Sequence, residues 1–296
     1  NSIGFSIQKS ERGGYASSSI YRHDINTFSA TLSFGRRFKW PDNYFRGSWS
    51  LSISESKYYN TKDALLEDFT EDQISSKGYG LLKGVSLNQV ISRDRRDKAE
   101  FPTSGSLVTW SSQFSGGFLG GDRNYSKNIF NINWYTPFKN NLVFTQNYKF
   151  GLINTPNESE YLPYNIRFLM GGSGIPYGEM LRGYPDNSVG PLNSNYSYYS
   201  SSGGKIMLKY SMELRYLLAD NPLLYMIFFA ETGNVWEEFD NVDIFDLKRS
   251  AGIGIRLHMP MLGVLGYDAS YGFDSVIDNG KANGWEYHLI FGMPFN

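Results

Sequence analysis

The sequence contains no cysteine, only three histidines and no apolar run long enough for a membrane helix. A chain without cysteine forms no disulfides and offers no thiolate ligand to a metal. The histidines, His23, His258 and His288, are too scattered for the ligand spacing of a zinc site. The best apolar stretch, 221–230, is about half as long as a membrane-spanning helix. The formal charge of −1 gives no broad attraction to nucleic acid, so we expect no nucleic-acid partner. From the cysteine and histidine content we expect no metal, and we expect no cofactor.

What the sequence has in abundance is aromatic residues and glycine, with 22 Tyr, 21 Phe and 31 Gly. Large apolar and smaller polar residues alternate along segments of roughly ten residues. In one such segment the large side chains are Ile206, Leu208, Tyr210, Met212 and Leu214. The side chains between them include Lys209, Ser211, Glu213 and Arg215. In a strand the two sets point to opposite faces of the sheet, so the pattern predicts an all-β chain.

Two architectures would use this alternation. A soluble sandwich would bury the large residues between two sheets, whereas a membrane barrel would turn them toward lipid and the polar ones toward the lumen. Charges within the polar faces, aromatic residues near strand ends, and connections that alternate between short and long favour the barrel. The sandwich stays open as the alternative.

The alternating segments predict one antiparallel transmembrane β-barrel domain over residues 1–296, with about twelve strands. The expected strands are 2–10, 25–39, 44–58, 77–93, 105–115, 124–137, 141–153, 205–218, 222–236, 248–260, 263–274 and 284–295. Strand parity places the turn at 101–105 and the chain end on one rim. It places the long connections near 58–76, 154–204 and 237–247 on the other rim.

The longest connection contains a segment, 171–191, in which a long cation stands among many glycines and prolines. This composition excludes a regular helix or a central strand. It fits either a loose surface loop or an ordered loop that carries Arg182 to buried carboxylates. Glu213 and Glu231 lie on the two strands that follow, so we expect Arg182 to contact at least one of them.

Two segments carry motifs beyond alternation. The turn SRDRRDKAEFPTSGS, residues 92–106, contains Arg93, Asp94, Phe101, Pro102, Thr103 and Gly105. The loop LRGYPDNSVGP opens with Leu181, Arg182, Gly183 and Tyr184. Together they resemble the Omp85 superfamily of outer-membrane barrels, which has an RD…FPTSG turn on the periplasmic side and a VRGF/Y loop that folds back inside the barrel. Leu181 in place of the usual Val is a mild departure.

Other segments extend the resemblance. Glu213 stands at the family's acidic position in one strand, and FFAETGNVW resembles the next strand, with Glu231 where Asp is commoner and with Gly233. The segment GRRFKWPDNYF, residues 35–45, is similar to the BamA branch of assembly factors rather than to the two-partner secretion transporters. The chain end resembles the family's C-terminal insertion signal, carried here by Trp285, Tyr287, Leu289, Phe291 and Phe295.

The resemblance implies a sixteen-stranded barrel preceded by periplasmic POTRA domains. The strands of this chain then correspond to the family's fifth to sixteenth, so we expect the first strands, the POTRA domains and the signal peptide to lie outside this sequence. Connection 154–204 becomes the long extracellular loop that folds into the lumen, with Leu181–Tyr184 facing the loop partners Glu213, Glu231 and Gly233.

Function also follows from the resemblance. It implies an integral protein of the bacterial outer membrane that inserts β-barrel proteins by strand templating at a lateral seam. Its partners would be the lipid bilayer, unfolded outer-membrane clients and periplasmic lipoprotein subunits. The alternative is an Omp85-type polypeptide secretion pore, of the two-partner secretion or translocation-assembly type. A passive porin is a third class, and an outer-membrane enzyme with catalytic groups on its long loops is a fourth. No catalytic constellation is evident, so we do not expect an enzyme, and we expect Asp268 and Asp274 to face water.

Overall fold

Twelve strands build the chain in the computed structural model, which describes residues 1–12, 24–59, 74, 79–139, 141–156, 162, 165–174, 178–191, 201–259, 263–276 and 281–292. The strands are β1 (Ser2–Arg12), β2 (Asp24–Arg37), β3 (Phe45–Tyr59), β4 (Gly80–Asp94), β5 (Gly105–Ser115), β6 (Tyr125–Lys139), β7 (Leu142–Asn154), β8 (Ile206–Asp220), β9 (Leu223–Trp236), β10 (Lys248–Met259), β11 (Gly263–Gly272) and β12 (Gly284–Gly292). Two short 3-10 helices, η2 (Gly117–Leu119) and η3 (Phe239–Asn241), accompany them. Among the described residues no helix is both long and apolar enough to cross a bilayer.

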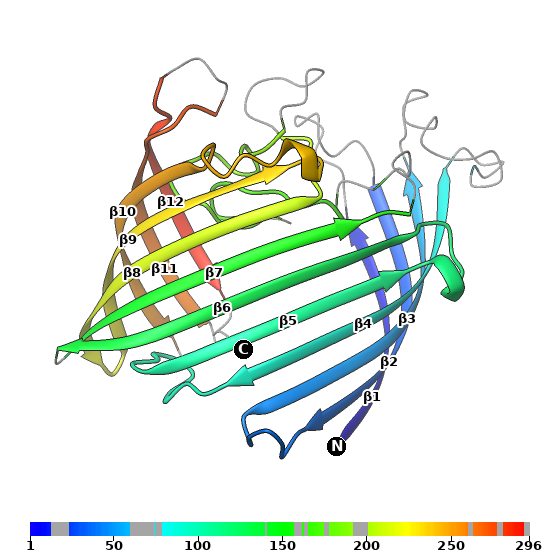
Figure 1. Ribbon diagram of the computed structural model, residues 1–296, viewed down its shortest axis with the longest axis horizontal. Helices are drawn as coiled ribbons and strands as arrows, with labels where there is room; N and C mark the ends of the chain where they lie inside the picture. Colours follow the sequence, from blue (N-terminus) through cyan, green and yellow to red (C-terminus); the bar gives the residue numbers. More distant parts are fainter. Residues whose placement is uncertain are drawn as a thin grey trace. The chain divides into compact units, whose positions relative to one another are not determined.

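Each strand lies beside its neighbours in sequence, and the order of the single sheet runs from β1 to β12 (Figure 1). The predicted all-β, twelve-stranded antiparallel fold is therefore confirmed. Its strand bounds agree with the sequence prediction to within a few residues, because alternation reports directly on a sheet that exposes one apolar face.

The described chain forms two compact units, of which the first comprises 1–92, 110–128 and 153–163, and the second 93–109, 129–152 and 164–296. In the first unit β2 pairs without a break with β1 and with β3. Hydroxyls meet across β2 and β3, as between Thr31 and Ser52 at 2.9 Å. The other face exposes large apolar side chains such as Phe5 and Leu32. One face is thus satisfied by polar pairs, and the other needs an apolar surrounding.

The second unit contains the pairings from β7 to β12. One face carries a buried cluster of Phe101, Tyr135, Val143, Tyr225, Ile227 and Phe229. The opposite, outward face exposes Trp134, Phe228, Ile253, Tyr267 and Tyr287. A sandwich would bury these large residues under a second sheet, so the sandwich alternative is wrong.

Strand direction assigns the connections of the second unit to two ends. The turns at 95–104 and 221–222 lie at one end, and the ends of β7 and β9, from which the next connections start, lie at the other. This is the arrangement that strand parity predicted for these segments. The chain end after 292 and most of 58–76 lie outside the described residues.

Ile253 tests whether the outward face contacts lipid. We expect Ile253→Arg to lower the free energy of unfolding in vesicles by about 2–4 kcal/mol, because a cation on a lipid-facing strand loses its hydration. Urea unfolding followed by tryptophan fluorescence measures the change. The control is Phe239→Arg, at an exposed apolar residue of η3, which should have little effect. Equal losses in the two variants would contradict the assignment of this face.

Candidate functional site

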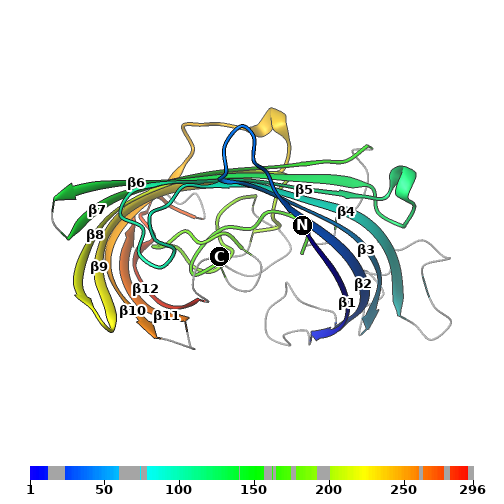
Figure 2. The ribbon, with the colours of Figure 1, turned by 90° about the horizontal axis from the view of Figure 1, so that it is seen from below.

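The connection between β7 and β8 packs against the sheet. We call its described residues 165–174 and 178–191 the inner loop. Figure 2 shows it, in lime green, on one side of β8 to β12. It folds on itself through isolated bridges that join Met170 to Val189 and Gly172 to Leu181. Leu169, Met170, Leu181 and Val189 are almost wholly buried, so the inner loop is a packed element rather than a loose surface loop.

Arg182 is the centre of the contact between the inner loop and the sheet. Its side chain is 2% exposed. The guanidinium donates to both carboxylate oxygens of Glu231, with Nη2–Oε1 at 2.7 Å and Nε–Oε2 at 3.1 Å. Nη2 also donates to Glu213 Oε1 at 2.7 Å, and Nη1 lies 3.6 Å from Asp268 Oδ2. The Arg182 backbone N–H adds a bond to Glu231 Oε2 at 2.9 Å. One arginine therefore ties the loop to β8, β9 and β11.

Each of these carboxylates also has a cation of the sheet beside it. Lys209 lies 3.5 Å from Glu231, Arg215 donates to Glu213 at 2.9 Å, and Arg256 makes two bonds to Asp268, at 2.6 and 2.7 Å. Three carboxylates and four cations thus alternate in a buried network. Burying charges is tolerated only when partners and hydrogen bonds replace water, which is the case here.

An aromatic ring completes the surroundings of Arg182. Its guanidinium carbon lies 3.5 Å from the centroid of the Phe229 ring, a close cation–π contact. Burial alone would lower the pKa of Arg182, but the attraction of Glu231 and Glu213 outweighs it and raises the pKa above its ordinary value. The arginine is charged at every physiological pH, so the inner loop is held by a permanent ion pair.

Gly183 brings the loop tip against the sheet. Its φ of 89° belongs to the left-handed region, and a Cβ there would lie 2.9 Å from Ser250 Cβ and 3.0 Å from Gly272 N. Only glycine fits such a close approach. Both polar groups of the residue are engaged, since its N–H donates to His288 Nε2 at 3.2 Å and its carbonyl accepts from Asn283 Nδ2 at 2.9 Å.

Tyr184 follows and is fully buried. Its hydroxyl donates to the backbone carbonyl of Arg249 at 2.6 Å and accepts the N–H of Asp274 at 3.4 Å. Burial raises the pKa of Tyr184, so the phenol is neutral and able to donate. Tyr184 thereby extends the loop contact to the region where β10 begins and β11 has ended.

A second ionic contact of opposite polarity lies three residues earlier in the loop. Glu179 pairs with Lys149 of β7, and its Oε1 lies 3.6 Å from Lys209 Nζ. Burial alone would raise the pKa of Glu179, but the two lysines lower it below its ordinary value. The loop therefore inserts one anion and one cation, each into a pocket of the other sign.

Gly233, expected as a loop partner, serves the packing of the loop. A Cβ at Gly233 would lie 2.8 Å from the sulfur of Met170 and 2.9 Å from the carbonyl of Leu208. Glycine at this point of β9 thus leaves the space that Met170 fills.

The turn motif is a compact hydrogen-bonded structure. Asp97 accepts the backbone N–H of Thr103 at 2.8 Å and of Ser104 at 3.1 Å, and it also accepts the Thr103 hydroxyl. Gly105 has a φ of 100°, and a Cβ there would lie 2.0 Å from the carbonyl of Arg95. These residues explain why the turn needs threonine and glycine.

The flanks of the turn are anchored to the sheet. Phe101 packs on Tyr225 with ring centroids 5.0 Å apart, and Pro102 beside it is buried. Arg96 makes two bonds to Asp94, both at 2.9 Å. Arg93 is half-buried at the end of β4. The turn therefore adds to the buried cluster of the second unit.

The last strand, β12, turns its aromatic residues outward. Trp285, Tyr287, Leu289 and Phe291 are between 60% and 70% exposed. His288 points the other way, toward the inner loop. Phe295, the last residue of the expected insertion signal, lies outside the described residues.

The sequence interpretation of Asp268 was wrong. Asp268 is wholly buried between Arg256 and Arg182 instead of facing water. Asp274 is also engaged, since it accepts two bonds from the Arg249 guanidinium, at 3.1 and 2.7 Å. Arg256, on the polar face of the preceding strand, could have indicated an ion pair with Asp268. Recognising it requires the pairing register of β10 and β11, in which Asp268 lies opposite Gly254.

Sequence reasoning also missed His288, Lys209 and Glu179 as residues that contact the inner loop or its partners. Lys209 alternates with large residues in β8. This pattern predicts that Lys209 lies on the polar face of the strand, but it does not identify the carboxylate that pairs with it. Over the part of the chain that the structure describes, no cluster of three or more His, Asp or Glu side chains could hold a metal ion.

Arg182 should contribute strongly to stability. We expect Arg182→Ala to lower the free energy of unfolding by about 3–5 kcal/mol, because the change removes three hydrogen bonds of the buried guanidinium to Glu213 and Glu231 and the cation that the carboxylates share. Arg182→Lys should retain only part of this free energy of unfolding, since lysine cannot bind Glu231 through two parallel N–H donors. Urea unfolding in vesicles measures both. Arg167→Ala is the control from the same loop, because its pair with Glu237 is more exposed and should contribute below about 1 kcal/mol. Similar losses for Arg182→Ala and Arg167→Ala would refute the role of the network.

Asp97 should make the stability of the turn depend on pH. Burial alone would raise the pKa of Asp97, but the bonds from Thr103 and Ser104 lower it overall. Its contribution is therefore complete above the ordinary aspartate pKa and is lost as the pH falls through the lowered folded value. Urea midpoints of wild type and Asp97→Asn should differ at neutral pH and converge in acid. Glu100→Gln, at an exposed acid of the same turn, is the control. A difference that persists unchanged in acid would contradict this prediction.

Comparison with known proteins places this site in a family. The Omp85 superfamily domain matches residues 1–289. The outer membrane protein assembly factor BamA of Nitratidesulfovibrio vulgaris is 26% identical over 271 residues, which are 88% of this chain and 31% of that protein. The chain thus spans about a third of the length of this curated relative.

A solved structure agrees in fold. The crystal structure of BamA from Haemophilus ducreyi lacking POTRA domains 1-3 matches with a TM-score of 0.74 at 17% identity, over 97% of this chain and 58% of that chain. The family match covers nearly the whole chain, and the twelve-stranded sheet has the same fold. The chain belongs to the Omp85 superfamily and is an integral β-barrel protein of the outer membrane.

Proposed function

We propose that this chain is the barrel part of an outer-membrane protein assembly factor. It receives unfolded β-barrel proteins and adds their strands along β12, without a catalytic step or a cofactor. The relative from N. vulgaris carries the name of such a factor, which supports the proposal. From the family resemblance we also infer that periplasmic lipoprotein subunits bind the complete protein.

The observation that carries the proposal is the set of hydrogen bonds between the inner loop and β12. The Gly183 peptide is bonded on one side to His288 in β12 and on the other to Asn283, just before that strand. Arg182 next to it is fixed to Glu213 and Glu231 on β8 and β9. The loop thus links β12 to β8 and β9 through one pair of neighbouring residues.

An edge strand held in this way is suited to template another strand. β12 pairs with β11 from Val264↔Gly292 to Gly272↔Gly284. On its other side it has no strand partner among the described residues, and in the proposed mechanism this side receives the client strand. Because the loop contacts the side chains of β12 rather than this edge, templating and loop contact are compatible.

Disulfide capture tests the proposal, since the chain has no cysteine of its own. The full-length protein with Leu289→Cys would be reconstituted in vesicles. It would then receive an unfolded barrel client that carries one cysteine in its last strand and is truncated so that it cannot close. We expect a disulfide between Leu289→Cys and the client, detected by non-reducing electrophoresis.

Ile253→Cys is the matched control, because it has similar exposure on the outward face of an internal strand. Capture confined to Leu289→Cys supports templating at β12. Equal capture at both positions would argue against it. Release of the client across the bilayer without integration would instead identify the secretion pore.

A further inference from the structure

The turn between β2 and β3 carries more positive charge than its own residues neutralise (Figure 1). We call residues 36–46 the basic turn. Its single acid is Asp42, whose Oδ1 accepts the backbone N–H of Tyr44 at 3.0 Å and so helps to shape the turn. Among the described residues no carboxylate forms an ion pair with the cations of the basic turn, which are Arg36, Arg37, Lys39 and Arg46.

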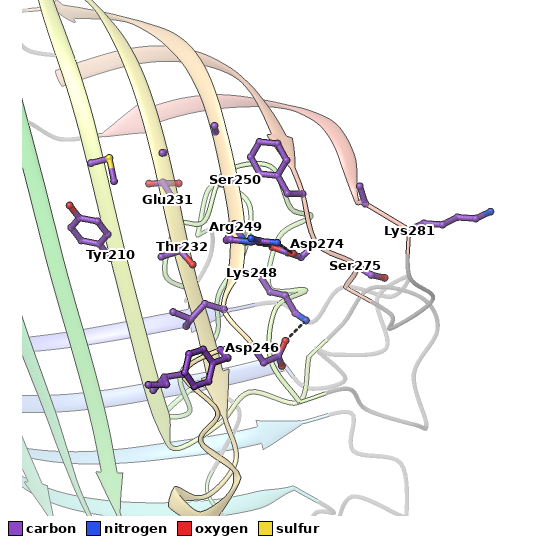
Figure 3. Close-up of a pocket in the computed structure, with 18 residues that line it drawn as sticks. Tyr210, Glu231, Thr232, Asp246, Lys248, Arg249, Ser250, Asp274, Ser275 and Lys281 are labelled. Atoms are coloured by element: carbon purple, nitrogen blue, oxygen red, sulfur yellow. Dashed lines mark hydrogen bonds and ion pairs between the residues drawn. The ribbon is translucent and has the colours of Figure 1, made fainter.

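Comparable cations near other strand ends are paired. Lys57, near the far end of β3, lies 3.2 Å from a carboxylate oxygen of Glu55. In the second unit Lys248, at the start of β10, pairs with Asp246 at 2.8 Å, as the dashed line in Figure 3 shows. The basic turn therefore differs from these strand ends, where a carboxylate of the chain itself balances the cation.

Two cations of the basic turn lie directly opposite each other. Arg37 is the last residue of β2, and the register pairs it with Arg46 near the start of β3. Opposite residues of antiparallel strands bring their side chains together on one face, where like charges are destabilising. Arg37 Nε donates to the carbonyl of Asn43 at 2.9 Å, which supplies no negative charge. A carboxylate between the two guanidinium groups would offset their repulsion.

The arginine pair belongs to the polar face of the sheet. Alternation along β2 places Arg37 on the same face as Thr31, whose hydroxyl bonds to that of Ser52 across the strands. Large apolar residues such as Leu32 point to the opposite face, which needs an apolar surrounding. The anion that meets Arg37 and Arg46 therefore comes from the polar side of the sheet, which suits a protein carboxylate better than a lipid headgroup.

An exposed aromatic residue stands beside these cations. Trp40 is 84% exposed, whereas the base of the turn is fixed. The Phe38 backbone N–H donates to the carbonyl of Phe45 at 2.9 Å, and the Phe38 ring packs edge-on against Trp49 with centroids 6.2 Å apart. An ordered turn thus presents tryptophan and arginine together, two residue types that are enriched where proteins bind each other.

Strand direction gives the end of the sheet at which the basic turn lies. β2 and β4 run in the same direction, so the basic turn lies at the end of the first unit where β4 also ends (Figure 1). The turn that follows β4 carries the RD…FPTSG motif, which the family has on the periplasmic side. A partner of the basic turn would therefore approach from the periplasm.

We propose that the basic turn is the docking surface for a periplasmic partner protein that contributes an acidic segment. A carboxylate of this segment lies between Arg37 and Arg46, and an apolar side chain covers Trp40. The repulsion between the arginines is present at all times, so only a partner that stays bound offsets it, and a passing client does not. The inference rests on the proposed function, since an assembly factor is expected to act with resident subunits.

Photo-crosslinking in intact cells tests this docking surface. The full-length protein would carry photoreactive benzoylphenylalanine in place of Trp40. We expect a covalent adduct with a protein, and mass spectrometry of the linked peptides should place the crosslink beside a segment rich in aspartate or glutamate. Arg37→Gln and Arg46→Gln should each lower the adduct yield about fivefold, which corresponds to the loss of one exposed ion pair.

Two further variants separate docking from a structural role of the turn. Lys57→Gln is the matched control, because it removes a cation of the same strand that is already paired with Glu55, and it should leave the adduct yield unchanged. Arg46→Glu should abolish the adduct in cells. In the purified protein, without partners, the same variant should raise the urea midpoint, because the new carboxylate faces Arg37.

The proposal would be overturned by adducts with lipid alone, by the absence of a protein adduct, or by captured segments without an excess of acidic residues. A yield that none of the arginine variants alters would overturn it as well. Client capture at Leu289→Cys is measured separately and distinguishes the two proposals. Capture of a client without a crosslink at the basic turn would refute only the docking surface, and the reverse result would refute only the assembly function.

Discussion

A buried guanidinium is the constraint on which the second unit of this protein depends. Burial of the Arg182 guanidinium is tolerated only because carboxylates pair with it. These carboxylates, Glu231, Glu213 and Asp268, come from three different strands. The requirement therefore fixes the strands as well as the loop. Since Arg256 also contacts Asp268 and other sheet cations contact the glutamates, removing any one member changes the charge that surrounds the others. The network is best understood as a unit rather than as separate ion pairs.

The strands could be predicted from the sequence because large apolar side chains alternate along them with smaller or polar ones, even though the inner face of the second unit also carries a buried aromatic cluster. Arg182 could be linked to Glu213 and Glu231 through motifs that stand in order along the chain. Asp268 and His288 could not be placed in the same way. Their role depends on the register of β10 to β12 and on how deep the loop tip lies, and neither is written in local sequence.

Opposite charges in the inner loop also specify how it sits. Glu179 and Arg182 are three residues apart, and each meets partners of the other sign on the sheet. A loop displaced by that distance would bring Glu179 beside Glu231, where two carboxylates repel each other. Attraction selects the correct seating, and repulsion raises the energy of the nearest incorrect one.

The contact between Gly183 and His288 joins residues 105 positions apart in the chain. Such a contact cannot form until the intervening strands have paired, because closing so long a segment of chain without them has a high entropic cost. The loop tip can therefore reach its final place only when β12 is already in the sheet. When the protein itself folds, docking of the inner loop is therefore a late step that follows the pairing of β12.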